Sequence, residues 1–200
     1  MLYHKMFEIS AFVLLLILVS FNLSSPEAKD IKVDVPMLKV QEPQYMNSTI
    51  NTYYDVPLEA DFQDFIIEEC NRRNVDPELV LAIMSVESDF QSDVISGTDD
   101  YGIMQINIAN HSELKEKLGI TNFLNPYESA TAGIYLLNQY QWCESEEQML
   151  MCYNMGITGA KEAWSNGIYE TQYVQKVMKA KKEIGESKYE IKVLFNQDIE

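Results

Sequence analysis

Histidine, cysteine and basic residues are scarce in this 200-residue chain. Neither of its two histidines, His4 and His111, stands in a pattern that would suggest a metal site or a histidine-based catalytic triad. The three cysteines show no CxxC or other metal-ligand spacing. Cys143 and Cys152 could form a disulfide, but buried free thiols are the simpler interpretation for these two and for Cys70. We therefore expect neither a metal nor another cofactor.

The shortage of basic residues also limits the partners of the chain. The 15 Lys and Arg residues are outnumbered by 31 Asp and Glu residues, so the net charge at pH 7 is −16. Such a surface would repel the phosphates of a nucleic acid, and any other anionic polymer would have to be held by local contacts. Since 46% of the residues are hydrophobic, the chain can bury a substantial core. Its length corresponds to one ordinary domain with additional segments.

The first additional segment is an apolar N-terminus. Residues 7–23 contain only four polar side chains, and residues 11–19 contain none. This length lies between that of a signal peptide and that of a membrane-spanning helix. Because the residues that follow offer a poor cleavage site, we predict that residues 1–23 remain as a single-pass transmembrane anchor, with the rest of the chain outside the cell. Secretion after signal cleavage is the alternative.

Beyond the anchor, the composition predicts three further parts. Residues 24–60 contain four prolines and no sustained hydrophobic period, which is typical of an extended tether. Residues 61–184 show helical spacing and no convincing alternating strand, so we predict an all-α domain there, followed by a C-terminal tail of residues 185–200. The helix-start signals in this domain are Asp76-Pro77-Glu78, Asn125-Pro126-Tyr127-Glu128, Ser145-Glu146-Glu147-Gln148 and Thr158.

Glu87 is an unexpected residue near the end of the helix that starts after Asp76. Helical spacing places it on the same face as Val80, Ile83 and Met84, where a core residue would be expected. Burial and the C-terminal end of a helix both disfavour a carboxylate and raise its pKa, which is what a general acid needs near neutral pH. The structural alternative is a side chain that turns outward to solvent from the last helical turn.

Later motifs carry polar side chains among apolar neighbours. Each has a structural explanation when taken alone: a tight turn, a helix end stopped by glycine, or a core tyrosine. These motifs are Gly102-Ile103-Met104-Gln105, Tyr153-Asn154-x-Gly156 and Tyr173-Val174.

Together with Glu87-Ser88, these motifs resemble in order and spacing the soluble-type lytic transglycosylases, a goose-lysozyme-like family. The resemblance covers about residues 61–184 and implies a lysozyme-like helical fold whose cleft binds the glycan strands of bacterial peptidoglycan. It implies that Glu87 is the catalytic residue. The substrate-binding residues that it implies are Ser88, Gly102, Met104, Gln105, Tyr153, Asn154 and Tyr173.

The reaction implied by the resemblance is cleavage of the MurNAc–GlcNAc β-1,4 bond for local remodelling of the cell wall. Glu87 would donate a proton to the glycosidic oxygen and then accept one from the 6-hydroxyl of the muramic acid, which leaves a 1,6-anhydro-MurNAc end. Ordinary glycosidases use a second carboxylate, which this family lacks.

Two alternatives to this reaction remain. A lysozyme-like muramidase would hydrolyse the bond with the help of Asp93, Asp99 or Asp100. We expect these residues to lie on an exposed, mobile loop, where they are poorly placed for catalysis. A non-catalytic glycan-binding module would account for the anchor and the tether, but the presence of Glu87 and the cleft motifs favours an enzyme.

Overall fold

The computed structural model describes residues 46–196. The predicted anchor, residues 24–45 of the predicted tether and residues 197–200 of the predicted tail lie outside the described residues. In the described range, none of the helices is long and apolar enough to cross a membrane. The elements of this range are β1 (Met46–Tyr53), α1 (Ala60–Arg73), α2 (Pro77–Ser88), β2 (Asp100–Tyr101), β3 (Ile106–Asn107), α3 (Ile108–Leu118), α4 (Pro126–Gln139), α5 (Glu146–Ser165), α6 (Gln172–Glu186) and β4 (Tyr189–Asn196).

The domain of residues 61–184 is mostly helical, but the prediction that it is all-α is wrong, because β2 and β3 form a short antiparallel pair within it. The local start signals explain most helix boundaries. Asp76 accepts a hydrogen bond from the backbone N–H of Glu78 at the start of α2, with Pro77 at the first helical position. Asn125 and Ser145 cap α4 and α5 in the same manner. These helices therefore start at the positions that the sequence predicts.

The predicted short helix at Thr158 is present, but it begins earlier than predicted, directly after a break at Gly156. Thr158 lies within α5, whose helical path is interrupted two residues earlier at Gly156, where φ is +72° and ψ is 163°. Only glycine adopts this conformation at low cost. The break therefore lies at Gly156, and the second helical segment runs from there to Ser165.

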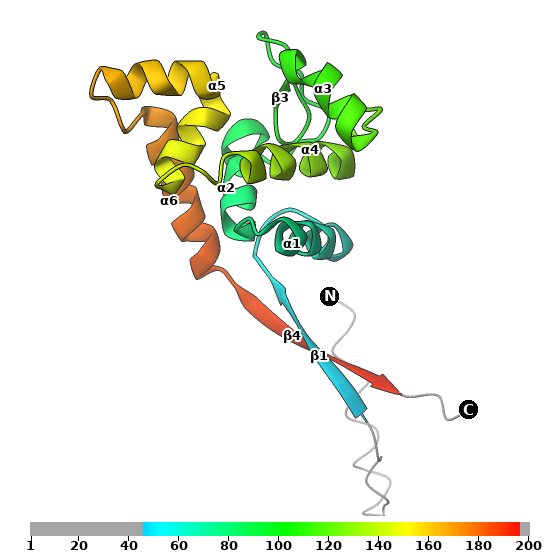
Figure 1. Cartoon of the computed structure of the whole chain (residues 1–200). Helices are drawn as coiled ribbons and strands as arrows, with labels where there is room; N and C mark the ends of the chain where they lie inside the picture. The colour runs from blue at the N-terminus through cyan, green and yellow to red at the C-terminus, as the bar shows by residue number, and fades with distance from the viewer. Residues whose placement is uncertain (1–45, 197–200) are drawn as a thin grey trace, which may run out of the picture. The chain divides into compact units, whose positions relative to one another are not determined.

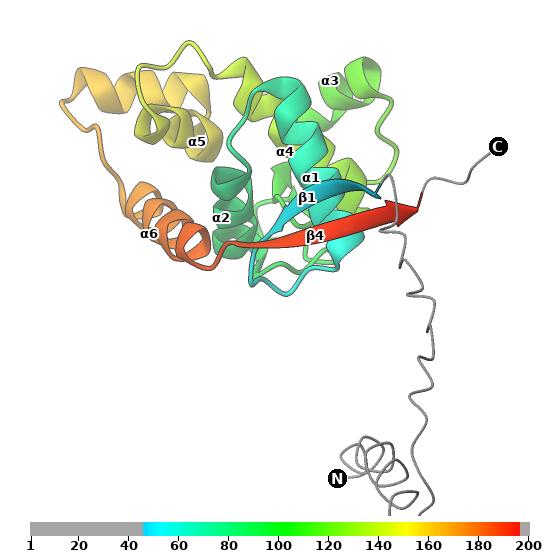
Figure 2. The same ribbon diagram turned by 90° about the horizontal axis from the view of Figure 1, so that it is seen from below.

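The core is centred on α2. Figures 1 and 2 show α6 and α1 on either side of this helix. Every side chain from Leu79 to Met84 is at most 1% exposed, so this stretch of α2 is apolar around its whole circumference, as expected of a central helix. The large aliphatic side chains in this run each contribute about 1.5–3 kcal/mol by burial. This packing fixes the position of the C-terminal turn of α2.

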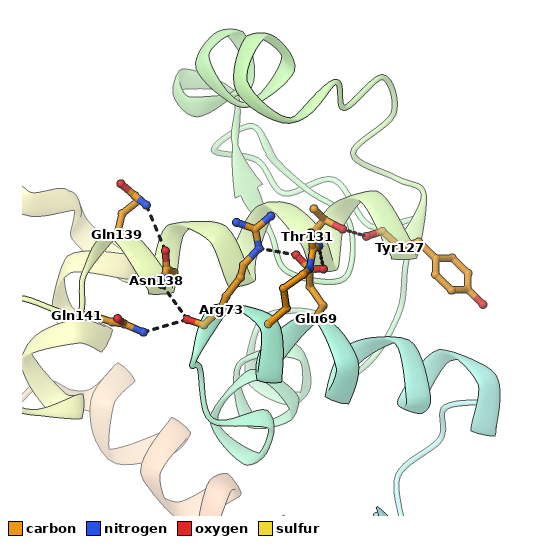
Figure 3. A network of polar contacts seen from close by, with 8 residues as sticks. Glu69, Arg73, Tyr127, Thr131, Asn138, Gln139 and Gln141 are labelled. Carbon is orange, nitrogen blue, oxygen red and sulfur yellow. Dashed lines mark hydrogen bonds and ion pairs between the residues drawn. The ribbon is translucent and has the colours of Figure 1, made fainter. Parts of the chain in front are cut away.

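A polar network joins the end of α1 to α4 (Figure 3). Glu69 is only 4% exposed and forms ion pairs with Arg72 and Arg73. The backbone carbonyl of Arg73 accepts hydrogen bonds from the side-chain amides of Asn138, at 2.8 Å, and Gln141, at 3.1 Å. These amides satisfy a carbonyl group that the helix end leaves without an intrahelical partner. The network thus secures α1 against the end of α4.

A two-stranded antiparallel ribbon of β1 and β4 departs from the prediction of an all-α chain with an extended tether and a tail. Its register runs from Met46 opposite Asn196 to Tyr53 opposite Tyr189. Just after β1, the backbone N–H of Tyr54 donates to the buried amide of Gln63 in α1 at 2.9 Å, which fastens the ribbon to the helices. Figure 1 shows the ribbon leading away from the helical domain.

Candidate active site

Glu87 is the penultimate residue of α2 and is half-buried. Its Oε1 accepts a hydrogen bond of 2.8 Å from the hydroxyl of Tyr173, which belongs to α6. The carboxyl group therefore points toward α6 and into the domain, and the outward orientation considered as the structural alternative does not occur.

The environment of Glu87 raises its pKa from 4.5 to about 7. Burial is the largest cause, and the negative charge of Asp100 adds to it, while the hydrogen bond from Tyr173 acts in the opposite direction. Burial also raises the pKa of the Tyr173 hydroxyl well above its usual value, so that group stays protonated and can donate. Near neutral pH, Glu87 is thus available both as an acid and as a base.

Residues 102–105 form the turn between β2 and β3. Gly102 has φ of +74°, and a Cβ atom there would lie 2.0 Å from the carbonyl oxygen of Phe123, so only glycine fits. The side-chain amide of Gln105 donates to the carbonyls of Gly102, at 2.9 Å, and Val94, at 3.2 Å. These contacts hold the Gln105 side chain beside the turn.

The turn is held against α5 by Tyr153. The Tyr153 hydroxyl donates to the carbonyl of Met104 at 2.8 Å. Burial raises the pKa of this hydroxyl well above its usual value, so it remains a donor. Asn154 is the next residue of α5 and is exposed, just before the break at Gly156. The two predicted motifs therefore meet in space.

A cleft of about 410 Å³ connects these residues, and its size is typical of small-molecule sites. Of the predicted site residues, Glu87, Gln105, Tyr153 and Asn154 line it. Tyr173 does not line the cleft itself and is linked to it by its hydrogen bond to Glu87. Within residues 46–196, no group of three or more His, Cys, Asp or Glu side chains is arranged to hold a metal ion.

Besides Tyr173, three predicted binding residues do not line this cleft: Ser88, Gly102 and Met104. Ser88 is buried, and its hydroxyl lies 2.9 Å from the carbonyl of Ile103 and 3.1 Å from that of Met84. Met104 is fully buried against Gly133. The structure gives these residues a positioning role, in which they fix the turn against α2 and α4.

Asp100 corrects one expectation about the acidic loop. Asp93 and Asp99 are exposed, as expected, but Asp100 is half-buried and lines the same cleft as Glu87. It belongs to β2, where its backbone is paired with Asn107. The polar composition of the loop predicted that Asp100 is exposed. The sequence does not show that β2 and β3 pair, and this pairing places the Asp100 carboxylate at the cleft.

Cys152 also lines the cleft, as do Tyr140 and Gly156, although none of the three was among the predicted site residues. The Sγ atom of Cys152 lies 3.9 Å from that of Cys143, and both thiols are free. The simpler interpretation was that the cysteines are buried free thiols; Cys70 and Cys152 are buried, whereas Cys143 is half-buried. The position of Cys152 directly before Tyr153 was the available signal that it lies near the site.

Residues 64–174 match the family described as the transglycosylase SLT domain, and this range is more than half of the chain. The chain belongs to this family. The SLT domain begins within α1 and ends within α6, so it includes Glu87, the turn, the start of α5 and Tyr173. Both strands of the β1–β4 ribbon lie outside it. The predicted resemblance to lytic transglycosylases is confirmed.

Two solved structures are similar to this SLT domain. One is an inactive mutant of the lytic transglycosylase Slt from Pseudomonas aeruginosa, with 22% sequence identity and a TM-score of 0.55; the similarity covers 65% of this chain and 24% of that chain. The other is the 70 kDa soluble lytic transglycosylase of Escherichia coli, with 16% identity and a TM-score of 0.49, covering 64% of this chain and 22% of that chain. The matched part of this chain thus spans about a quarter of the length of either protein.

Proposed function

We propose that this protein is a peptidoglycan lytic transglycosylase that cleaves the MurNAc–GlcNAc β-1,4 bond and leaves 1,6-anhydro-MurNAc ends. The observation that carries this proposal is Glu87, a half-buried carboxyl group with a pKa of about 7 on the wall of a cleft. Membership of the SLT domain family supports the same reaction. The substrate is the glycan strand of peptidoglycan, which the polar lining of the cleft can hold by hydrogen bonds.

Glu87 performs two successive proton transfers in this reaction. It first donates its proton to the glycosidic oxygen, and the bond between that oxygen and C1 of the muramic acid breaks. The 6-hydroxyl oxygen of the same sugar then forms a bond with C1, and its proton passes to the Glu87 carboxylate. A pKa near 7 suits both steps, because the protonated and ionised forms are close in free energy. Tyr173 keeps the carboxyl oriented between them.

The test compares full-length wild type with Glu87→Gln on purified peptidoglycan. Glutamine keeps the shape of the side chain and can still accept the Tyr173 hydrogen bond, but it has no acidic proton to transfer to the glycosidic oxygen. We expect the variant to lose roughly 10²–10⁴-fold in rate, the range typical of general acid–base catalysis. Glu116→Gln is the matched control, because Glu116 is exposed on α3 and does not line the cleft. Substantial activity of Glu87→Gln would show that another group is the acid.

The products decide between this reaction and a second candidate, hydrolysis. Asp100 in the cleft is the observation that favours hydrolysis, because a second carboxylate near the acid is the usual arrangement in glycosidases. Mass spectrometry of the released fragments separates the two reactions: anhydro ends are lighter than hydrolysed ends by one water. Products that carry the additional water would assign the protein to the muramidases.

We also propose that residues 1–23 anchor the protein in the cell membrane with the domain outside. The apolar run of residues 7–23 and the poor cleavage context support this location, and both lie outside the described residues. The N-terminal sequence of the mature protein in a membrane fraction provides the test. A secreted form that begins between residues 24 and 30 would overturn the anchor.

A further inference from the structure

Cys143 and Cys152 bring two thiols together beside the cleft, and the cleavage assigned to Glu87 uses neither of them. Their Sγ atoms lie 3.9 Å apart. A disulfide bond is about 2.05 Å long, so this separation of 3.9 Å has to shorten by about 1.9 Å for a bond to form. Cys70, the third cysteine, is fully buried in the hydrophobic core. Cys143 and Cys152 are therefore the pair suited to a disulfide.

Local hydrogen bonds hold the two cysteines in this arrangement. The backbone N–H of Cys143 donates to the carbonyl of Tyr140 at 2.9 Å, in the turn that follows α4. Two capping bonds then lead the chain into α5. Ser145 Oγ accepts from the N–H of Gln148 at 3.3 Å, and the Gln148 side chain accepts from the N–H of Glu144 at 3.1 Å. The path of the chain between the two cysteines is thus fixed, and their thiols are held beside each other.

The two thiols differ in access and in acidity. Cys143 is half-buried, whereas Cys152 is fully buried although it borders the cleft. Burial raises the pKa of the Cys152 thiol to about 12. Burial also raises the pKa of Cys143, but there the hydrogen bond from Cys152 acts in the opposite direction. Because the thiolate is the reactive form, Cys143 is the residue that an external disulfide meets first.

We propose that Cys143 and Cys152 form a reversible disulfide bond that joins the end of α4 to α5 at the wall of the cleft. The oxidant is an external disulfide. The Cys143 thiolate attacks one of its sulfur atoms, and the other sulfur leaves as a thiolate. The Cys152 thiolate then attacks the Cys143 sulfur and displaces the second external thiolate. Two cysteine thiols are oxidised, the external disulfide is reduced to two thiols, and the protons of the cysteines pass to the leaving thiolates.

This bond connects the two elements that form one side of the cleft. Leu136 and Tyr140 line the cleft from the end of α4, and Cys152 lines it from α5. Tyr153, the next residue, holds the turn between β2 and β3 through the Met104 carbonyl. The disulfide therefore limits the separation of α4 from α5 and keeps this wall in place. The proposed location outside the cell suits such a bond, because disulfides persist in oxidising compartments.

The first test incubates the purified full-length chain with oxidised glutathione. The chain is then unfolded in urea, alkylated with iodoacetamide and digested for mass spectrometry. We expect a pair of peptides linked through Cys143 and Cys152, lighter by two hydrogens than the separate thiol peptides, together with an alkylated Cys70. Recovery of every cysteine as an alkylated thiol, or a link that includes Cys70, would overturn the inference.

Single serine variants test the order of attack. Cys152→Ser keeps the accessible thiol and removes its partner, so Cys143 should retain glutathione as a mixed disulfide. Cys143→Ser removes the accessible thiol, so Cys152 should stay reduced under the same conditions. Equal retention of glutathione by the two variants would contradict the entry of the oxidant at Cys143 and overturn the assigned route.

Thermal unfolding tests whether the bond supports the cleft wall. The oxidised wild type should unfold roughly 5–15 °C above the reduced form, from the typical stabilisation by a disulfide in a domain of this size. Cys143→Ser is the matched control, because it cannot form the bond and Cys143 lies outside the cleft lining. Its unfolding temperature should be the same with and without oxidised glutathione. Equal unfolding temperatures for oxidised and reduced wild type would overturn the supporting role of the bond.

The inference goes beyond the proposed function and does not rest on it. Its readouts are the state of the thiols and the unfolding temperature, and neither depends on cleavage of peptidoglycan. A wild type that forms the Cys143–Cys152 bond but leaves peptidoglycan intact would support the inference and overturn the proposed function alone. A wild type that cleaves peptidoglycan but stays fully reduced in oxidised glutathione would do the reverse.

Discussion

Replacing Glu87 by glutamine should stabilise the folded protein above pH 7 and leave its stability almost unchanged at pH 4. The folded-state pKa of about 7 lies above the value of 4.5 expected for an unfolded chain. The protonated carboxyl is therefore favoured by folding. Its contribution is fully present below pH 4.5 and is lost as the pH rises through about 7. The difference of about 2.5 pH units, at ~1.36 kcal/mol each, corresponds to about 3 kcal/mol.

Urea denaturation of wild type and Glu87→Gln between pH 4 and pH 9 measures this effect. The chain can be studied at full length in mild detergent, with Trp142 and Trp164 as fluorescent probes; their rings lie 6.3 Å apart beside α5. With a urea slope of about 1–3 kcal/mol per molar, the variant midpoint should exceed that of wild type by about 1–3 M at pH 8. Glu116→Gln, the surface control, should follow wild type at every pH. If the unfolding free energies of Glu87→Gln and wild type changed with pH in the same way, the raised pKa of a buried Glu87 would be refuted.

Two further predictions concern the contacts that shape the site. Tyr173→Phe removes a hydrogen bond that stabilises the ionised form of Glu87. A hydrogen bond to such a charged acceptor contributes about 1.5–3 kcal/mol. The alkaline limb of the pH–rate profile should therefore move up by about 1–2 pH units, and a limb that stays in place would contradict the contact. Gly102→Ala should cost about 2–5 kcal/mol in unfolding free energy, from its positive φ and the clash with a backbone carbonyl. Gly119→Ala has a similar φ of +71° but open space, so it should cost only about 1–2 kcal/mol, and equal losses would exclude the clash.

The features that could be predicted from the sequence are those set by neighbouring residues. Asp76-Pro77 and Asn125-Pro126 each contain a capping side chain and a proline within two positions, so the helix start is a local property. The buried position of Glu87 follows from the apolar residues one and two turns before it. These signals do not depend on how the helices are packed.

The features that could not be predicted depend on residues far apart in the chain. β1 is stabilised by pairing with β4, and Tyr53 lies opposite Tyr189 although the whole helical domain separates them in the sequence. The orientation of Asp100 depends on its pairing with Asn107 and on the position of the turn against α2. The composition of β1 and of the segment around Asp100 resembles that of an ordinary tether or loop, because the residues of one strand do not reveal the strand with which it pairs.

The β1–β4 ribbon also makes the two ends of the described structure neighbours. Met46 lies opposite Asn196, so the chain enters and leaves at one place. Strands of eight residues span about 26 Å at a rise of ~3.3 Å per residue, which makes the ribbon a spacer between that place and the helices. A surface attachment introduced after Asn196 would therefore hold the cleft at the same distance from that surface as an attachment before Met46. The ribbon is therefore one attachment point for the described domain, and a linker can join it at either the start of β1 or the end of β4.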